Sequence, residues 1–470
     1  MPMPLAIKTI LKNLQKDLEQ SLKETQVPGA SIAVLYKGEI YRAAAGITNV
    51  NTNIKVTSDT LFHIGSVSKL FTATQVMQLV DQGKVDLDMP YSHYVPEFEL
   101  QDEKARKTIT IRQLLSHTSG IMGDFFEDTG RGDDCLKKYA KACKKISTVH
   151  DPGQIFSYCN AGFSLLGRLI EKLTGKIWEE TLEQSVFKPL GMCYCAALPE
   201  RELHFTSAVG HEPLAEWPAP PNGEWKVDGK YRRSVGPAGS VIAVSPTELI
   251  HFVQMHLNGG VAADGTRILS KESVKKMQEV QVDIPYSLRY KAWGLGWMRF
   301  DWSGQNVIGH DGGTASMGTF LRIIPEKGVA IAMSGNGGDT GALIFRSVFA
   351  KLLKELADVE LPGTPEPDPA LKLDLSKYTG TFRRYGMEVK VDYKNDKLTA
   401  LVSSKDGEDN VPMPMTFNVT PVTKEIFQVS VIPGMPPMIM HFINFDSEGR
   451  PGHLHSGERA LKRLDQAATA

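Results

Sequence analysis

The chain has 470 residues, of which 41% are hydrophobic and 23% charged, and its formal net charge is −1. This length exceeds one ordinary core and predicts two or three domains, while the composition is typical of a soluble globular protein. The near-zero net charge provides no long-range attraction to nucleic acid or to an anionic membrane, so we expect neither as a partner.

The N-terminal segment predicts an amphipathic helix, whose apolar side would carry Leu5, Ile10, Leu11, Leu14 and Leu18. Lysines interrupt its apolar run, so it does not resemble a secretion signal. No later window reaches the ~20 apolar residues that a membrane span needs. A cytoplasmic protein is therefore expected. The odd count of five cysteines then favours reduced thiols over a disulfide framework.

Further along the chain, strand-like runs at 30–35 and 39–45 predict a hairpin, and a helix is predicted over 68–82. The middle, roughly 84–290, carries mostly helical patterns. Apolar runs with glycine or proline breaks then predict an antiparallel meander, before a helix over 343–356; these runs are 294–300, 306–309, 319–324 and 329–334. The order of elements predicts an α/β (α+β) domain over 1–357, interrupted by a mostly helical insertion.

Four prolines between positions 362 and 369 mark 358–370 as a stiff, extended linker. Beyond it, short strand-like runs recur at 378–382, 388–393, 397–402, 427–431 and 438–445. Residues 371–470 are therefore predicted to form a separate all-β, barrel-like domain.

Ser66 and Lys69 form the first pattern with a chemical meaning. Their spacing at the opening of a predicted helix places both side chains on one face, where the helix end adds unpaired N–H groups. A serine hydroxyl is a poor nucleophile until a base takes its proton, and a lysine in a dry site can have a pKa low enough to serve. Alone, this spacing also fits a capped helix with a surface lysine.

Two further segments place polar groups at predicted loops. Tyr158 and Asn160 precede a strong helical pattern, although a packed tyrosine beside an N-capping turn would look the same. Residues 309–313, Gly-His-Asp-Gly-Gly, lie between two predicted strands. Glycines there would let the backbone approach a ligand and offer an N–H to an oxyanion. The simpler interpretation is a glycine-rich hairpin turn.

Taken in order, Ser-x-x-Lys, Tyr-x-Asn and a basic residue-x-Gly resemble the motif set of class C β-lactamases and related penicillin-recognising enzymes. Family-like phrases surround them at 27–29, 86–88, 114–120, 237–239 and 294–297. The resemblance covers roughly 20–357 and implies a β-lactamase/transpeptidase-like fold, with an antiparallel sheet flanked by helices. The phrase at 375–382 makes the C-terminal domain similar to the lipocalin-like barrels of some such hydrolases, which assist assembly or cover the active site.

The resemblance also implies roles. Ser66 would attack a carbonyl and become acylated, while Lys69 and Tyr158 would share the general acid and base work in unassigned proportions. The backbone N–H groups of Ser66 and Gly313 would form the oxyanion hole. Neither a cofactor nor a metal is implied.

Substrate binding would fall to Asn160, His310 and Gly312, with orientation of Lys69 as the alternative role of Asn160. Many relatives carry a lysine at the position of His310, where it holds a substrate carboxylate. Histidine is only fractionally charged near neutral pH, which weakens such an anchor. The His-Asp-Gly sequence instead resembles the variant found in many esterases and D-amino-acid peptidases of this superfamily.

We therefore expect a serine hydrolase that acts on an ester, a small amide or a peptide. Carboxylesterase and D-amino-acid peptidase rank ahead of β-lactamase. Acyl transfer to an alcohol or amine, as in a transferase or peptide cyclase, shares the acylation half and stays open. A slowly deacylating penicillin-binding sensor also stays open, and a scaffold with a vestigial site is least favoured. The expected partners are the small-molecule substrate and further copies of this chain, associated through the C-terminal domain.

Other conspicuous residues are interpreted structurally. His117 is expected to organise a loop, and the acidic stretch 124–134 to be a solvated loop at the rim of the site. Trp293 and Trp297 are expected to pack in the meander, with a lining of the acyl pocket as the less favoured alternative. Cys159 is expected to be a small packed side chain that could make the enzyme sensitive to thiol reagents.

Overall fold

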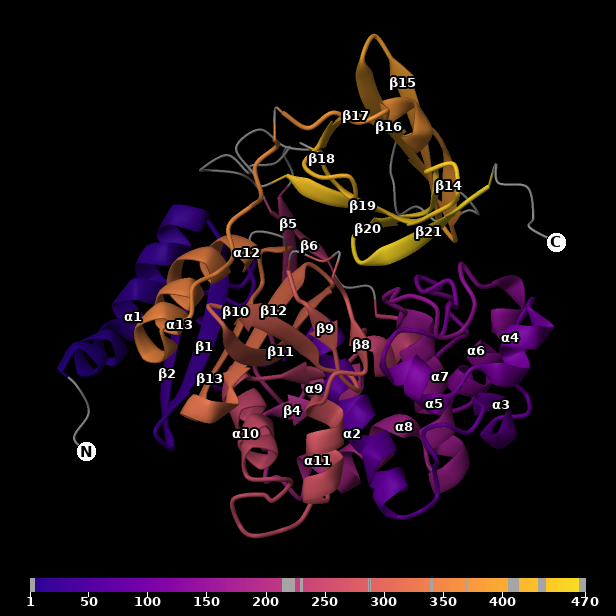
Figure 1. The fold of residues 1–470 in the computed structure, drawn as a ribbon. Coiled ribbons are helices and arrows are strands. Elements are labelled where there is room, and N and C mark those ends of the chain that lie inside the picture. Colours follow the sequence, from indigo (N-terminus) through magenta and orange to yellow (C-terminus); the bar gives the residue numbers. More distant parts are fainter. Residues whose placement is uncertain are drawn as a thin grey trace.

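The computed structural model describes residues 5–213, 225–228, 231–285, 287, 289–338, 341–368, 370–404, 414–429 and 437–464. An eight-stranded antiparallel sheet with helices on both faces is followed by a closed all-β barrel (Figure 1). The predicted fold class is therefore confirmed. Among the described residues, no helix combines the length and the apolar character needed to cross a membrane.

The large sheet has the strand order β2-β1-β13-β12-β11-β10-β9-β8. The predicted hairpin is β1 and β2, and every residue of β1 is buried. The strands span β1 (Gly29–Tyr36), β2 (Glu39–Gly46), β8 (Val282–Asp283), β9 (Ala292–Trp293), β10 (Met298–Trp302), β11 (Gln305–Thr314), β12 (Met317–Ile324) and β13 (Val329–Gly335).

Two details of the predicted meander are wrong. The run 294–300 is not one strand, because a turn at Gly296, with a φ of +86°, separates β9 from β10. The segment 309–313 is not a hairpin turn, because it lies inside β11 and pairs with β12 from Ile308 to Thr314. The turn between these strands comes later, at Ala315 and Ser316, both of which have positive φ angles.

Helices cover both faces of the sheet (Figure 1). α1 (Leu5–Thr25), α12 (Gly341–Ile344) and α13 (Ala350–Ala357) pack on one face, while α2 (Ser68–Asp81) and α10 (Pro246–Leu257) pack on the other. Leucines buried at helical spacing hold α1 on the sheet: Leu11, Leu14, Leu18 and Leu22. Leu5 was predicted to share this face but is 80% exposed, so the buried face begins after the first turn.

The middle of the chain is mostly helical, as predicted. Its helices are α3 (Tyr91–Tyr94), α4 (Glu103–Thr108), α5 (Ile111–Leu115), α6 (Cys135–Ala142), α7 (Asn160–Thr174), α8 (Trp178–Leu182), α9 (Pro199–Glu202) and α11 (Lys271–Gln278). Of these, α7, α8 and α11 pack against α2. Short strands connect this region to the sheet domain: β3 (Phe62–His63), β4 (Cys195–Ala196), β5 (Gly210–Pro213), β6 (Trp225–Asp228) and β7 (Ala243–Val244).

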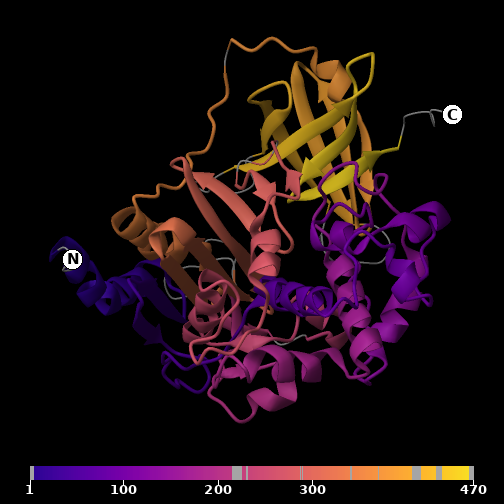
Figure 2. The same ribbon diagram turned by 60° about the horizontal axis from the view of Figure 1, so that its bottom comes forward.

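After α13 the chain leaves the sheet as an extended segment and enters the barrel (Figure 2). The barrel has its own apolar core and closes by pairing its first strand with its last. Its strands are β14 (Gly380–Arg384), β15 (Met387–Lys394), β16 (Lys397–Ser404), β17 (Met415–Pro421), β18 (Ile426–Val429), β19 (Met438–Phe445), β20 (Pro451–Ser456) and β21 (Arg459–Arg463). The strands β17, β20 and β21 were not predicted.

Candidate active site

Ser66 lies in a 3-10 turn, Gly65–Val67, that leads directly into α2, and Lys69 is fully buried in the first turn of that helix. The Lys69 Nζ atom lies 2.9 Å from Ser66 Oγ, 2.7 Å from Asn160 Oδ1 and 2.5 Å from the carbonyl oxygen of Ala238. Burial, and next the positive charge of Arg459, lower the pKa of Lys69 well below its ordinary value. A neutral amine at this position has a lone pair for the Ser66 proton.

Glycines bring three backbone segments together around Ser66. A Cβ atom on Gly312 would lie 1.9 Å from the carbonyl oxygen of Ile64 and 3.0 Å from Ser66 N. On the other side, a Cβ atom on Gly239 would lie 2.8 Å from Ser66 N. Only glycine allows such close approach, so β11 and the turn at Gly239 both lie against the main chain of the serine.

Tyr158 is buried, with 4% of its surface exposed. Lys69 Nζ lies 4.8 Å from the centre of the Tyr158 ring. Burial raises the pKa of Tyr158 above its ordinary value, and the nearby Ser66 side chain opposes that rise only in part. Tyr158 is therefore a phenol that holds its proton at neutral pH, next to a lysine whose burial favours the neutral amine.

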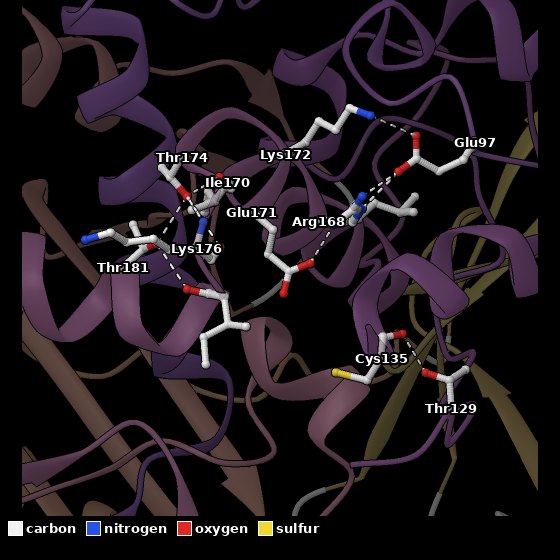
Figure 3. A network of polar contacts seen from close by, with 12 residues as sticks. Glu97, Thr129, Cys135, Arg168, Ile170, Glu171, Lys172, Thr174, Lys176 and Thr181 are labelled. Carbon is white, nitrogen blue, oxygen red and sulfur yellow. Dashed lines mark hydrogen bonds and ion pairs between the residues drawn. The ribbon is translucent and has the colours of Figure 1, made fainter. Parts of the chain in front are cut away.

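Asn160 is the first residue of α7, so the local sequence places its amide at the helix start beside Lys69. Polar contacts hold the far half of this helix (Figure 3). Arg168 donates to Glu97 at 2.7 Å and to Glu171 at 3.0 Å, and the Thr174 hydroxyl donates to the carbonyl of Ile170. The contact with Glu97 joins the helix that carries Asn160 to the segment after α3, and the other two contacts lie within α7.

His310 lies on β11, fully buried, and its Nδ1 atom is 2.7 Å from the carbonyl oxygen of Asp311. Burial, and next the charge of Lys69, lower the pKa of His310 to about 3. The ring is therefore neutral near pH 7, and not fractionally charged as an unperturbed histidine would be. Its Nε2 atom is buried and makes no hydrogen bond with any described residue.

Sequence reasoning missed Asp124. It was assigned to a solvated rim, but only 7% of its surface is exposed, and its Oδ1 atom accepts a hydrogen bond from Asn160 Nδ2 at 3.0 Å. Arg459 donates to the same carboxylate at 2.8 Å and 3.0 Å, and Arg384 lies 3.0 Å from it. Burial opposes ionisation of Asp124, but the two arginines lower its pKa below the ordinary value. An aspartate flanked by Met122, Phe125 and Phe126 was the available signal.

The barrel contributes to this site through the turn between β20 and β21 (Figure 1). The backbone N–H of Tyr158 donates to the carbonyl of Glu458 at 2.9 Å, and the N–H of Ala460 donates to Ser157 Oγ at 3.1 Å. The Arg459 guanidinium lies 4.8 Å from the Tyr158 ring centre. No sequence motif pointed to these residues, because their partners lie some three hundred positions earlier in the chain.

The residues interpreted structurally behave as expected, apart from Asp124. His117 is buried and its Nδ1 atom accepts a hydrogen bond from the N–H of Cys159 at 2.9 Å, which organises the Tyr158 loop. Trp293 and Trp297 are fully buried. The Trp293 ring packs against the rings of Tyr158 and His310 and so supports both side chains. Cys159 is 1% exposed, and all five cysteines are free thiols.

Comparisons with known proteins identify the family of this chain. The family model described as Beta-lactamase matches residues 14–347. Penicillin-binding protein 4 of Amycolatopsis lactamdurans is 39% identical over 377 residues, which cover 77% of this chain and 95% of that protein. Among solved structures, that of SurE superposes with a TM-score of 0.81 at 27% identity, covering 98% of this chain and 100% of SurE. A second structure, SurE with D-Leu, has a TM-score of 0.75 at 26% identity, covering 97% and 100%. The chain therefore belongs to the Beta-lactamase family and is an enzyme of the serine-hydrolase type.

Proposed function

We propose that this enzyme forms an acyl intermediate on Ser66 and hydrolyses an ester, a small amide or a peptide. The observation that carries the proposal is the 2.9 Å contact between Lys69 Nζ and Ser66 Oγ, at a site whose burial favours the neutral amine. Because the Tyr158 phenol keeps its proton in the same site, a base and an acid are both present beside one hydroxyl.

In the acylation step, Ser66 Oγ bonds to the substrate carbonyl carbon while its proton moves to Lys69 Nζ. The carbonyl oxygen becomes an oxyanion, which the N–H groups of Ser66 and Gly313 would stabilise. When the bond to the leaving group breaks, that group takes a proton from Tyr158, and Lys69 returns a proton to Tyr158. A water molecule then repeats these transfers in reverse and releases the acid product together with the free Ser66 hydroxyl.

The substrate is proposed to carry a D-amino acid residue or a simple ester. Neutral His310 offers no cation to a substrate carboxylate, so an uncharged group would lie beside β11, with Asn160 and Gly312 as further contacts. Support for a D-amino acid comes from the SurE structure that contains D-Leu, which resembles this chain over 97% of its length. Carboxylesterase and D-amino-acid peptidase activities remain the two leading forms of the proposal, with weak β-lactamase activity third.

Acyl transfer is a second candidate, and the covered site favours it. Tyr158, Asn160 and His310 are all less than 7% exposed, and the barrel turn at Glu458 lies directly against the tyrosine. A site that limits water would let an amine or alcohol compete for the acyl group. An added amine should then form an amide product at the expense of hydrolysis. A sensor that deacylates slowly would instead hold a stable adduct on Ser66.

Intact-mass spectrometry after mixing with p-nitrophenyl butyrate, a penicillin and a D-alanyl p-nitroanilide tests the proposal, with chromophore release followed in parallel. We expect a transient acyl mass on the wild-type protein and turnover of the ester or the anilide. Ser66→Ala should lose both, and Tyr158→Phe should slow acylation by about 100-fold or more. Turnover that survives in folded Ser66→Ala would exclude Ser66 as the nucleophile.

Self-association through the barrel is also proposed, and light scattering of the full chain measures it.

A further inference from the structure

The carboxylate of Asp124 is surrounded by protein groups. Its two oxygens accept hydrogen bonds from Asn160 Nδ2 at 3.0 Å, from Arg459 Nε at 2.8 Å and from Arg459 Nη2 at 3.0 Å, and Arg384 Nη1 forms an ion pair with Oδ2 at 3.0 Å. An ionised carboxylate offers about four acceptor positions, and these contacts engage both of its oxygens. Asp124 therefore acts on the protein itself.

The side chain that Asp124 controls is the amide of Asn160. A carboxylate accepts only, so the NH₂ end of the amide must face Asp124 and the carbonyl end must face Lys69 Nζ, 2.7 Å away. Rotation of the amide by half a turn would place two donors together at Lys69 and two acceptors together at Asp124. The carboxylate thus selects the one orientation that holds Lys69 within reach of Ser66 Oγ.

Both cations that hold Asp124 belong to the barrel. Arg384 is the last residue of β14 and Arg459 is the first of β21, whereas Asp124 precedes α6 in the helical region. In the docked structure Asp124 is buried, and a buried carboxylate without a partner is strongly unfavourable, so the two barrel arginines are what keeps it ionised there. Barrel docking and amide orientation are therefore linked through one carboxylate.

We propose that Asp124 is a positioning residue which, held by Arg384 and Arg459 of the barrel, orients Asn160 toward Lys69 and so makes acylation of Ser66 depend on the docked barrel. This inference rests on the proposed acyl-enzyme function. It assigns to the barrel a direct part in the chemistry, in addition to covering the site.

The charges around Lys69 should also affect the pH profile of acylation, which a purely structural role of Asp124 would leave unchanged. Arg459 lowers the pKa of Lys69, whereas Asp124, Cys159 and Glu458 raise it. Tyr158, His117 and His310 also lie close to Lys69. Burial raises the pKa of the tyrosine and lowers the pKa values of both histidines. Loss of the Arg459 charge should therefore raise the pKa of Lys69, and the fall of the acylation rate at low pH (the acidic limb of the pH profile) should move to higher pH. Loss of the Asp124 charge should lower the pKa of Lys69 and move the acidic limb to lower pH.

The test measures the rate of Ser66 acylation in the full chain from pH 4 to pH 9, by stopped-flow release of p-nitrophenol from p-nitrophenyl butyrate. The variants are Asp124→Ala, Asp124→Asn, Arg459→Met and Arg459→Lys, with the exposed sheet residue Asp301→Asn as the matched control. We expect Asp124→Ala to slow acylation by about 100-fold, since small misplacements cost this much. Asp124→Asn keeps an acceptor for Asn160 and should recover at least tenfold of that loss. The acidic limb should lie at higher pH in Arg459→Met than in Asp124→Asn, and Arg459→Lys should stay near the wild type.

If Ser66 in Asp124→Ala were acylated at the wild-type rate, the inference would be overturned. Equal rates for Asp124→Ala and Asp124→Asn with unmoved acidic limbs would overturn it as well, because Asp124 would then only hold the barrel. If Asp124→Ala does not fold, the order of the limbs in Asp124→Asn and Arg459→Met decides the question alone. Failure of the wild type to acylate Ser66 at all would instead defeat the proposed function, so the two failures are distinguishable.

Discussion

The backbone N–H of Tyr158 donates to the carbonyl of Glu458 over 2.9 Å, so the proposed proton donor is held in place by the barrel. The Glu458 side chain also forms an ion pair with Arg289 at 3.1 Å, and Arg289 forms a second ion pair with Asp311. Because Asp311 follows His310 on β11, one barrel turn contacts both the tyrosine side and the sheet side of the site. The barrel and the rest of the chain therefore both contribute to the candidate active site.

The first prediction concerns the hydrogen bond beside this contact. Ser157→Ala removes the acceptor of the Ala460 N–H, which is buried, and should lower the free energy of unfolding by ~1–3 kcal/mol. Urea unfolding measures this loss, and hydrogen exchange should become faster at the start of β21. Ser376→Ala, an exposed serine elsewhere in the C-terminal region, is the control. Unchanged exchange at Ala460 would show that this bond does not fasten the barrel.

The second prediction concerns the close approach of β11 to Ser66. In Gly312→Ala the new Cβ would lie 1.9 Å from the carbonyl oxygen of Ile64, so the strand must move away from the serine. Overpacking of this kind costs ~1–3 kcal/mol of stability, and a misplaced oxyanion hole should slow acylation on the order of 100-fold. The matched control is Gly318→Ala on β12, where the nearest non-neighbouring atoms lie 3.7 Å or more away. Equal activity of the two variants would argue against a role for this contact.

Sequence reasoning could predict those parts of the candidate site whose residues lie close together in the chain. Ser66 and Lys69 share one helical turn, and Tyr158 and Asn160 lie two residues apart at a helix start, so spacing alone brings each pair together. The strand at 305–314 was partly mistaken for a turn because Gly-His-Asp-Gly-Gly has low β propensity. These glycines serve the contact with Ile64 and Ser66, and that contact becomes visible only in three dimensions.

The charges around Asp124 could not be predicted for a different reason. Its run of acidic neighbours is typical of a solvated loop, and the two arginines that neutralise it come from the barrel. A hairpin tip such as Ser-Gly-Glu-Arg carries no signal for a distant partner, since charged residues are common at turns. Burial of Asp124 follows from tertiary packing that no local pattern encodes.

The third prediction concerns the thiols. Cys193 is exposed, Cys195 is half-buried with its pKa raised by burial, and the other three cysteines are buried; burial raises the pKa of Cys159 to about 11. Thiolates are the species that iodoacetamide alkylates, so the folded enzyme should acquire a single adduct at Cys193 and keep its activity. Peptide mapping identifies the site, and Cys193→Ser should remove it. An adduct on Cys159 in folded protein would instead support the thiol sensitivity considered from the sequence.

The last prediction concerns acid stability and the buried His256 on α10. Its ring packs against Phe252 and Trp297, neither ring nitrogen has a partner among the described residues, and burial lowers its pKa to about 3. Between this pKa and the unfolded value of about 6.5, the unfolded chain binds a proton that the folded chain refuses. Stability contributed by the neutral ring is therefore present above about pH 6.5 and falls as the pH decreases. Because His256→Phe removes this proton, the loss of unfolding free energy between pH 7 and pH 5 should shrink by about 2 kcal/mol. Urea titrations at both pH values measure it, with the exposed residue His204→Phe as the control. An identical pH dependence in His256→Phe and wild type would mean that His256 is protonated inside the core.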